Sequence, residues 1–258
     1  MSDSLKDRVA IVTGGSRGLG LAIATAFAAE GARVVVASTG QQGADNAAKT
    51  IPGAIGIECD VREEDQVKGL IDATVERFGA VHVMVPNAGI LSPYPLLGMD
   101  FARWRALMSV NLDAAFLSLH YAAPAIIASG GGSLVMMSSV AGTAGVPLMA
   151  HYAAAKSAIL SLTKTAALEL RDHGVRVNAL VPGLVAGTDM GDGLGPECDE
   201  LLGLPAGSFD AMMAQKQGRF GTAQDVARAA VFLASGQDSS WITGTALHVD
   251  GGLTASLL

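Results

Sequence analysis

Short apolar runs rich in Val, Ile and Leu alternate along the chain with longer stretches that have helical periodicity. Runs of four to eight apolar residues are typical of buried strands, and longer periodic stretches are typical of helices packed on a sheet. The predicted strands are Val9–Thr13, Arg33–Ser38, Ala54–Cys59, Val81–Pro86, Leu134–Met137, Val175–Val181 and Ala246–Val249. The predicted helices are Leu19–Glu30, Glu63–Phe78, Phe101–Ser129, His151–Arg171 and Asp225–Ala234.

This regular alternation predicts an α/β fold. The expected architecture is a Rossmann-type doubly wound parallel sheet with helices on both faces, and with sites at the carboxyl ends of the strands. A length of 258 residues is natural for one such unit, and no internal repeat or linker divides the sequence. We therefore expect a single domain over residues 1–258.

The middle of the chain is unusually apolar. Mean hydropathy is +0.40, and residues 114–155 contain no Asp, Glu, Lys or Arg. A membrane span needs about 18 continuous apolar residues. Pro124, the run Gly130–Gly132 and Pro147 interrupt the stretch well before that length. The sequence therefore favours core helices and a buried strand over a membrane segment.

Charge and cysteine content restrict the partners that we expect. The 17 Lys and Arg residues face 24 Asp and Glu residues, which gives a net charge of −7 and no basic block. Binding to nucleic acid or to an anionic membrane is therefore not expected. Cys59 and Cys198 match neither a disulfide framework nor a metal-site spacing, so no metal is expected. The N-terminal MSDSLKDR has no apolar signal segment, which predicts a cytoplasmic protein.

A glycine-rich turn follows the first predicted strand. Gly14, Gly18 and Gly20 lie in VAIVTGGSRGLG, where this strand passes into the first turn of the first predicted helix. A strand, a glycine turn and a helix N-terminus together bring backbone N–H groups against a pyrophosphate, with no side chains in the way. The plain alternative is a tight turn that binds nothing. The second strand at Arg33–Ser38 completes a βαβ unit and favours the dinucleotide site.

The end of that second strand bears on the choice of cofactor. In NAD-binding units an acidic residue about 20 positions beyond the glycines binds the ribose hydroxyls. Here Ser38 and Thr39 occupy that region, and no carboxylate occurs before Asp45. Arg17 can give a charge-assisted bond to a 2′-phosphate, unless it is only a solvated loop residue. We therefore favour NADP(H) over NAD(H), which stays open.

A possible catalytic group follows the strand at Leu134–Met137. Ser138 and Ser139 end that strand, and Tyr152 and Lys156 share one helix face because they are four residues apart. A nearby ammonium lowers the pKa of a phenol by roughly 1–3 units, which suits a general acid and base. Ser139 would hold a substrate oxygen beside it. The alternative is an exposed helix start with an unrelated Tyr and Lys.

These motifs occur together in one order. They are TGGSRGLG at 13–20, Asp60, NAG at 87–89, Asn111, Ser139, YAAAK at 152–156, PG at 182–183 and the ITGTALHVDGG tail. In this combination the chain resembles the short-chain dehydrogenase/reductase family in its single-domain form. The nearest likeness is to 3-oxoacyl-[acyl-carrier-protein] reductases.

The resemblance implies a role for each matching residue. Tyr152 would be the acid and base, Lys156 would lower its pKa, Ser139 would hold the substrate oxygen, and Asn111 would position a water in a proton relay. Thr188 is a less regular match, because four residues rather than three separate it from Pro182–Gly183. The implied cofactor contacts are Gly14, Ser16, Arg17, Gly18, Leu19, Gly20, Ser38, Thr39, Asp60, Val61, Asn87, Ala88, Gly89, Tyr152, Lys156, Pro182, Gly183, Val185 and Thr188.

The expected function is hydride transfer between a nicotinamide cofactor and a ketone or secondary alcohol. A non-catalytic dinucleotide sensor is the alternative of another class. Enoyl reduction is disfavoured, since relatives with that chemistry space the Tyr and Lys more widely. We expect residues 188–218, here called the lid segment, to cover the substrate.

The sequence around the expected pocket favours a neutral, largely apolar substrate. The lid segment carries six acidic residues against Lys216 alone, which disfavours anions. An acyl-carrier thioester therefore ranks second. The apolar walls expected are Leu91, Pro93, Tyr94, Leu96, Val146, Leu148 and Met149.

Two further expectations concern surfaces. The uncharged helices around 114–129 and 151–163 and the apolar end at Leu257 and Leu258 would be awkward on a monomer, and relatives are commonly tetramers, so we expect a homotetramer or dimer. His151 precedes Tyr152, and we expect it to face away from the substrate.

Overall fold

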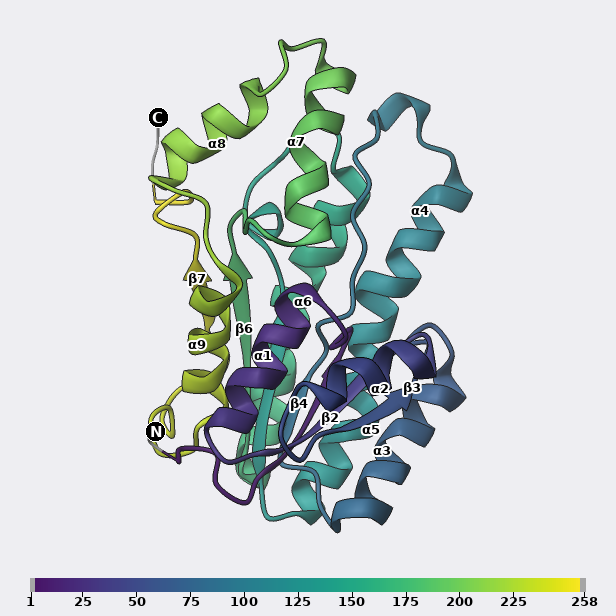
Figure 1. Cartoon of the computed structure of the whole chain (residues 1–258), viewed down its shortest axis with the longest axis vertical. Helices are drawn as coiled ribbons and strands as arrows, with labels where there is room; N and C mark the ends of the chain where they lie inside the picture. Colours follow the sequence, from purple (N-terminus) through teal and green to yellow (C-terminus); the bar gives the residue numbers. More distant parts are fainter. Residues whose placement is uncertain (1–2, 256–258) are drawn as a thin grey trace.

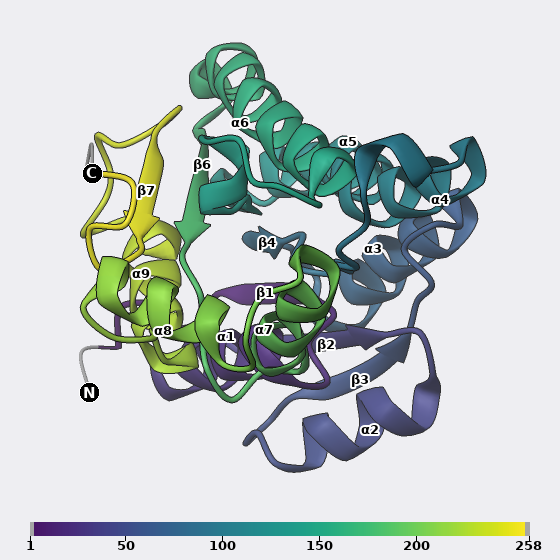
Figure 2. The ribbon, with the colours of Figure 1, turned by 90° about the horizontal axis from the view of Figure 1, so that it is seen from above.

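A computed structural model describes residues 3–255, which contain a seven-stranded parallel sheet in the order β3-β2-β1-β4-β5-β6-β7 (Figures 1 and 2). The predicted α/β fold with a doubly wound parallel sheet is confirmed. The order reverses between β1 and β4, which is where such sheets open a crevice for a ligand. The strands are β1 Val9–Thr13, β2 Arg33–Ser38, β3 Ile55–Glu58, β4 Val83–Val85, β5 Gly132–Met137, β6 Val175–Pro182 and β7 Ala246–Val249.

Helices cover both faces of the sheet, as Figure 2 shows. Successive strand residues point to opposite faces. In β1, Ala10 and Val12 pack with the helices on one face of the sheet, whereas Ile11 packs with the helices on the other. The helices are α1 Gly18–Ala29, α2 Gln41–Lys49, α3 Glu64–Phe78, α4 Phe101–Met108, α5 Ala114–Ala128, α6 Ala150–Leu170, α7 Asp189–Leu202, α8 Ser208–Gln217 and α9 Ala223–Ala234.

The long helix predicted at Phe101–Ser129 is interrupted by a π-helical turn. α4 and α5 lie on either side of the π-helical residues Ser109–Asp113. Asn111 lies in this turn and is buried. π-turns inside α-helices occur frequently at functional sites, because the extra residue redirects a side chain. The stretch Phe101–Ala128 is long and apolar enough to cross a membrane, but core helices pass the same test, so this is weak evidence.

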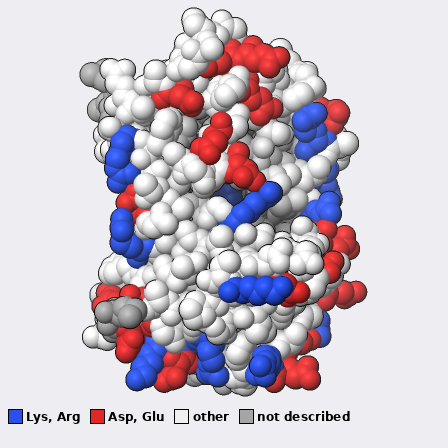
Figure 3. All heavy atoms as spheres, in the orientation of Figure 1, with Lys and Arg blue, Asp and Glu red and all other residues white. Residues whose placement is uncertain are grey.

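The lid segment consists mainly of two helices, α7 and α8, above the carboxyl end of the sheet (Figure 1). Asp199 of α7 is buried and accepts hydrogen bonds from Gly207 N at 2.7 Å and Phe209 N at 2.8 Å. These bonds join the two helices and satisfy free N–H groups at the start of α8. Acidic side chains gather over the upper end of the molecule, where these helices lie (Figure 3). Leu257 and Leu258 lie outside the described residues.

Candidate active site

A single cleft of about 1730 Å³ runs along the carboxyl ends of the strands. Pockets for one small ligand usually have volumes of about 300–1,000 Å³, so this cleft can hold a dinucleotide together with a substrate. Every residue that the sequence predicts to contact the cofactor lines it, from Gly14 in the glycine turn to Thr188 in the lid segment. Ser139, Tyr152 and Lys156 line the same cleft.

The glycine turn has the backbone form that the sequence predicts. Gly14 and Gly18 adopt positive φ values of 61° and 54°, which L side chains rarely adopt. A Cβ on Gly20 would lie 2.2 Å from Gly14 O, so no side chain fits there. α1 begins at Gly18, and its first N–H groups have no partner within the helix. The turn therefore suits a pyrophosphate at the N-terminus of α1.

The adenosine end of the cleft lies at the ends of β2 and β3. Ser38 Oγ donates to Ser16 Oγ at 3.2 Å, which links the end of β2 to the glycine turn. Asp60 is held by Arg62, whose Nε lies 2.9 Å from Oδ1. This hydrogen bond lowers the pKa of Asp60. The end of β2 thus presents the hydroxyl groups of Ser38 and Thr39, and Asp60, which follows β3, is paired with the cation of Arg62.

Tyr152 and Lys156 are both buried near the N-terminus of α6. Burial raises the pKa of the Tyr152 phenol, and its hydrogen bond with Ser139 acts in the opposite direction. Burial lowers the pKa of Lys156 to about 8. Lys156 Nζ donates to Met137 O at 2.9 Å and lies 5.6 Å from the centre of the Tyr152 ring. The Tyr152 pKa therefore shifts upward in this structure, against the expected lowering by Lys156, because burial has a larger effect than the hydrogen bond with Ser139.

The two serines at the end of β5 have different surroundings. Ser138 is buried, and its Oγ donates to Lys156 O at 2.8 Å, so it fixes α6 to the strand. Ser139 is partly exposed in the cleft, where it interacts with Tyr152 and accepts from Ala141 N at 3.2 Å. Ser139 is thus the serine with a hydroxyl group available beside the phenol.

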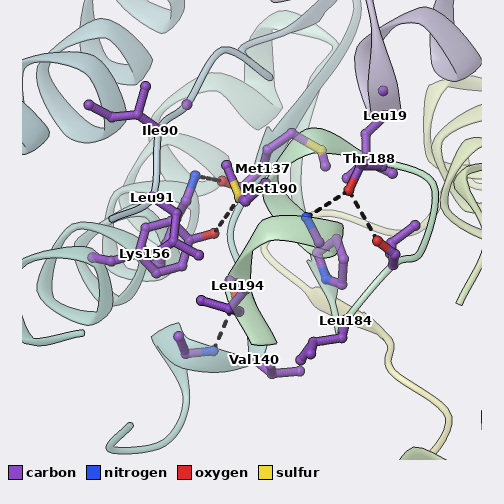
Figure 4. Close-up of a pocket in the computed structure, with 18 of the residues that line it drawn as sticks. Leu19, Ile90, Leu91, Met137, Val140, Lys156, Leu184, Thr188, Met190 and Leu194 are labelled. Atoms are coloured by element: carbon purple, nitrogen blue, oxygen red, sulfur yellow. Dashed lines mark hydrogen bonds between the residues drawn. The ribbon is translucent and has the colours of Figure 1, made fainter. Parts of the chain in front are cut away.

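Apolar side chains, among them Leu91, Met190 and Leu194, line the cleft near Lys156 (Figure 4). The Tyr152 hydroxyl donates a weak bond to Met190 Sδ at 3.9 Å, so the lid segment reaches the phenol. The contributing side chains come from three loops and both lid helices: Leu91, Val146, Met149, Leu184, Met190, Leu194, Cys198, Leu202, Phe209, Met212 and Met213. The cleft therefore contains an apolar chamber. At its end lie the hydroxyl groups of Ser139 and Tyr152 and the buried ammonium of Lys156.

Comparison with known proteins identifies the family. A family model described as enoyl-(acyl carrier protein) reductase matches residues 14–254. The chain is 38% identical over 262 residues to 2-(S)-hydroxypropyl-CoM dehydrogenase 3 of Xanthobacter autotrophicus, covering 99% of this chain and 100% of that one. It is 34% identical over 253 residues to a 3-oxoacyl-[acyl-carrier-protein] reductase of Thermotoga maritima, covering 96% of this chain and 98% of that one.

A solved structure from Sinorhizobium meliloti 1021, described as a short-chain alcohol dehydrogenase, is similar throughout. Its TM-score is 0.90, with 33% identity and 100% of both chains covered. The chain belongs to the short-chain dehydrogenase/reductase family. This family member is an NAD(P)-dependent oxidoreductase that acts on CH–OH groups and interconverts a ketone and a secondary alcohol.

Asn111 lies behind the cleft of this dehydrogenase and is absent from its lining. Its Oδ1 accepts from Ile90 N at 3.0 Å, and its Nδ2 donates to Ile90 O at 2.7 Å. A Cβ on Gly89 would lie 2.6 Å from Asn111 Oδ1 and 3.7 Å from Lys156 Nζ. Asn111 therefore fixes the loop beside Lys156, with Gly89 between them.

Thr188 serves as the N-cap of α7 in the dehydrogenase. Its Oγ1 accepts from Gly191 N at 3.0 Å and donates to Val185 O at 3.0 Å. Its side chain also lies 3.7 Å from the position of a Cβ on Gly18, so the lid segment meets the glycine turn here. The unusual spacing after Pro182–Gly183 thus still brings Thr188 to the cleft.

Several substrate-side predictions need correction. Pro93, Tyr94, Leu96 and Leu148 do not line the cleft. Tyr94 instead stacks on Arg103, whose guanidinium lies 4.1 Å from the ring centre. By contrast, His151 does not line the cleft, which agrees with the expectation that it faces away from the substrate. It is fully buried, and both of its ring nitrogens lack a hydrogen-bond partner among the described residues.

One face of α7 lines the cleft although the sequence pattern did not predict it. Met190, Leu194, Cys198 and Leu202 recur every four residues and all line the cleft. This spacing is a helical signal, but the glycines at 191, 193 and 195 obscured it. No cluster of His, Cys, Asp or Glu suited to a metal occurs within residues 3–255.

Proposed function

We propose that this enzyme prefers NADP(H), with NAD(H) as the weaker cofactor, and that it acts on a neutral, largely apolar ketone or secondary alcohol. One observation carries the proposal: a single cleft joins the glycine turn to Ser139, Tyr152 and Lys156 and ends in an apolar chamber. The cofactor assignment depends on the end of β2, where Ser38 and Thr39 leave no carboxylate to repel a 2′-phosphate.

In this proposal Tyr152 transfers the proton of the reaction. Reduction adds a hydride to the carbonyl carbon and a proton to its oxygen, and the bound nicotinamide supplies the hydride. The Tyr152 hydroxyl donates the proton in reduction and accepts it in oxidation. The phenol is protonated at neutral pH, as the donor role requires, although burial raises its pKa and so makes it a weaker acid in this structure. Ser139 holds the same substrate oxygen by a hydrogen bond.

Lys156 and Asn111 would return the proton to Tyr152. With a pKa of about 8, Lys156 can exchange a proton near neutral pH. Asn111 is fixed beside Lys156 by its two bonds to Ile90. In our proposal it positions a water that connects Lys156 with solvent.

The substrate assignment is based on polarity. The lid segment carries Asp189, Asp192, Glu197, Asp199, Glu200 and Asp210 against Lys216, a balance that disfavours anions. The cleft beyond Tyr152 is lined mainly by Leu, Val, Met and Phe. The alternative is a 3-oxoacyl-[acyl-carrier-protein] reductase, as the Thermotoga relative is named. An acidic carrier protein would need a basic docking patch, and the stretch 128–132, ASGGG, provides none.

The test is a comparison of specificity constants. NADPH oxidation would be measured with a neutral cyclic or aryl ketone and with acetoacetyl thioesters, including the carrier-bound form. We expect the neutral ketone to give the larger kcat/KM. A large preference for the carrier-bound thioester would make the alternative the correct assignment.

We also propose that the whole chain acts as one dinucleotide-binding unit, with the lid segment closing over the substrate, and that it forms a tetramer or dimer in the cytoplasm. Phe101, Leu97 and Phe116 are 74%, 101% and 48% exposed, which is apolar area that a partner copy would cover. Light scattering at micromolar concentration tests the assembly, and a monomeric mass would contradict it.

A further inference from the structure

One ion pair bridges the two walls of the cofactor cleft. Arg17 belongs to the glycine turn and Asp189 to the first turn of α7, and both line the cleft. Arg17 Nη1 lies 2.8 Å from Asp189 Oδ2. The two side chains are 79% and 71% exposed, so they meet at the mouth of the cleft. Residues 172 positions apart in sequence are thus paired across the cofactor site.

The local structure holds Asp189 in this position. Thr188 caps α7 directly before it, and the Thr188 side chain packs near Gly18, next to Arg17 in the sequence. A carboxylate in the first turn of a helix is favoured by the helix dipole. Asp192 lies in the same turn but has a different partner, because its Oδ1 accepts a hydrogen bond from Gly187 N at 2.9 Å. Only one of these two acidic residues is therefore paired with the arginine.

Arg17 is also the cation on which our NADP(H) assignment depends. It is the only Lys or Arg in the glycine turn, and the end of β2 adds only the hydroxyls of Ser38 and Thr39. Arg62 lines the same end of the cleft but holds Asp60. A carboxylate on Arg17 occupies donors that a phosphate would use and repels the negative charge of that phosphate.

We propose that Asp189 is a specificity-determining residue that competes with the 2′-phosphate of NADP(H) for Arg17 and thereby limits the preference over NAD(H). The proposal rests on the proposed use of NADP(H) through Arg17. Asp189 acts through Arg17 as a positioning residue and has no role in the chemical step. Because both side chains are exposed, the competition weakens as salt screens the charges.

The experiment measures dissociation constants for NADPH and NADH by titration calorimetry, without substrate. The variants are Asp189→Asn and the matched control Asp192→Asn, which removes the same charge from the same helix turn. Each is also made in an Arg17→Ala background. We expect Asp189→Asn to tighten NADPH binding roughly three- to fivefold while NADH changes less than twofold. The effect should shrink at high salt, and most of it should be lost in the Arg17→Ala background.

The outcomes separate this inference from the function on which it rests. If Arg17→Ala weakens NADPH selectively but Asp189→Asn leaves the NADPH-to-NADH ratio unchanged, the Asp189 inference is wrong and the cofactor assignment stands. An equal shift with Asp192→Asn would also overturn the inference, since general charge would then explain it. If Arg17→Ala weakens both cofactors equally, the NADP(H) assignment itself fails, and the inference fails with it.

Discussion

Met190 Sδ lies 3.9 Å from the Tyr152 hydroxyl, so the lid segment touches the candidate acid and base directly. A substrate oxygen that accepts the Tyr152 proton must take the place of this sulfur. Methionine is flexible and adapts to irregular space, which suits a side chain that has to move. The shape of the substrate chamber is thus set partly by α7.

Met190→Ala is expected to widen the chamber over Tyr152. Removing the side chain should raise kcat/KM for bulky aryl ketones relative to small ketones, by roughly three- to tenfold, since it leaves space beside the phenol. Leu201→Ala is the control, because Leu201 lies on the same helix and does not line the cleft. An unchanged ratio in Met190→Ala would show that the sulfur does not restrict the substrate.

Arg17→Ala should weaken the binding of NADPH far more than the binding of NADH. A charge-assisted bond to phosphate contributes roughly 1.5–3 kcal/mol, so we expect NADPH affinity to fall about ten- to a hundredfold. NADH affinity should change little. Fluorescence titration of both reduced cofactors measures this, with Arg33→Ala as the control, since Arg33 does not line the cleft. Equal losses for NADPH and NADH would refute the cofactor assignment.

Two glycine-to-alanine changes should have opposite effects on stability. A Cβ on Gly20 would lie 2.2 Å from Gly14 O and 2.6 Å from Asn87 Nδ2. Gly20→Ala should lower the free energy of unfolding by about 1–3 kcal/mol and weaken cofactor binding. Gly69 lies in α3 with nothing within 4 Å of its Cβ position. Gly69→Ala should stabilise by up to about 1 kcal/mol. Urea denaturation measures both, and equal effects would contradict the account of the glycine turn.

Lys156 should reduce stability at neutral pH. Its pKa falls from 10.5 to about 8 on folding because burial disfavours the ammonium. Between these two pH values the unfolded chain binds more protons than the folded chain. The loss of folding stability caused by the buried ammonium is therefore complete below pH 8 and disappears toward pH 10.5. Lys156→Met removes the group. The stability of Lys156→Met relative to wild type should therefore decrease by about 1–3 kcal/mol as the pH rises from 7 to 10. Guanidinium denaturation at both pH values measures the difference, and a constant difference would show that the buried ammonium carries no such cost.

The sequence predicts the parts of this fold that have strong apolar periodicity. The strands and the helices around them occur within a few residues of the predicted positions. α2 was missed because its buried residues are three alanines, Ala44, Ala47 and Ala48, in a polar and glycine-containing segment. These alanines have helical spacing, but their stripe is short and only weakly apolar, and the helix takes its position from packing on β2 and β3.

The candidate site, like the fold, could be predicted from the sequence only in part. Short motifs locate the glycine turn and the Tyr152 and Lys156 pair, because these depend on backbone form and local spacing. The walls of the substrate chamber depend on how α7 and α8 fold back over the sheet, which local patterns do not specify. The direction of the Tyr152 pKa also required the structure, since it results from a balance between burial and hydrogen bonding.

The most direct test of the central claim is the turnover of Tyr152→Phe with NADPH and the best ketone found. Phenylalanine keeps the ring and the packing but removes the hydroxyl that transfers the proton. We predict NADPH affinity within about threefold of wild type and a loss of kcat of roughly a hundredfold or more. Tyr94→Phe, outside the cleft, should keep wild-type turnover. Near-wild-type turnover in purified Tyr152→Phe would contradict the proposed mechanism.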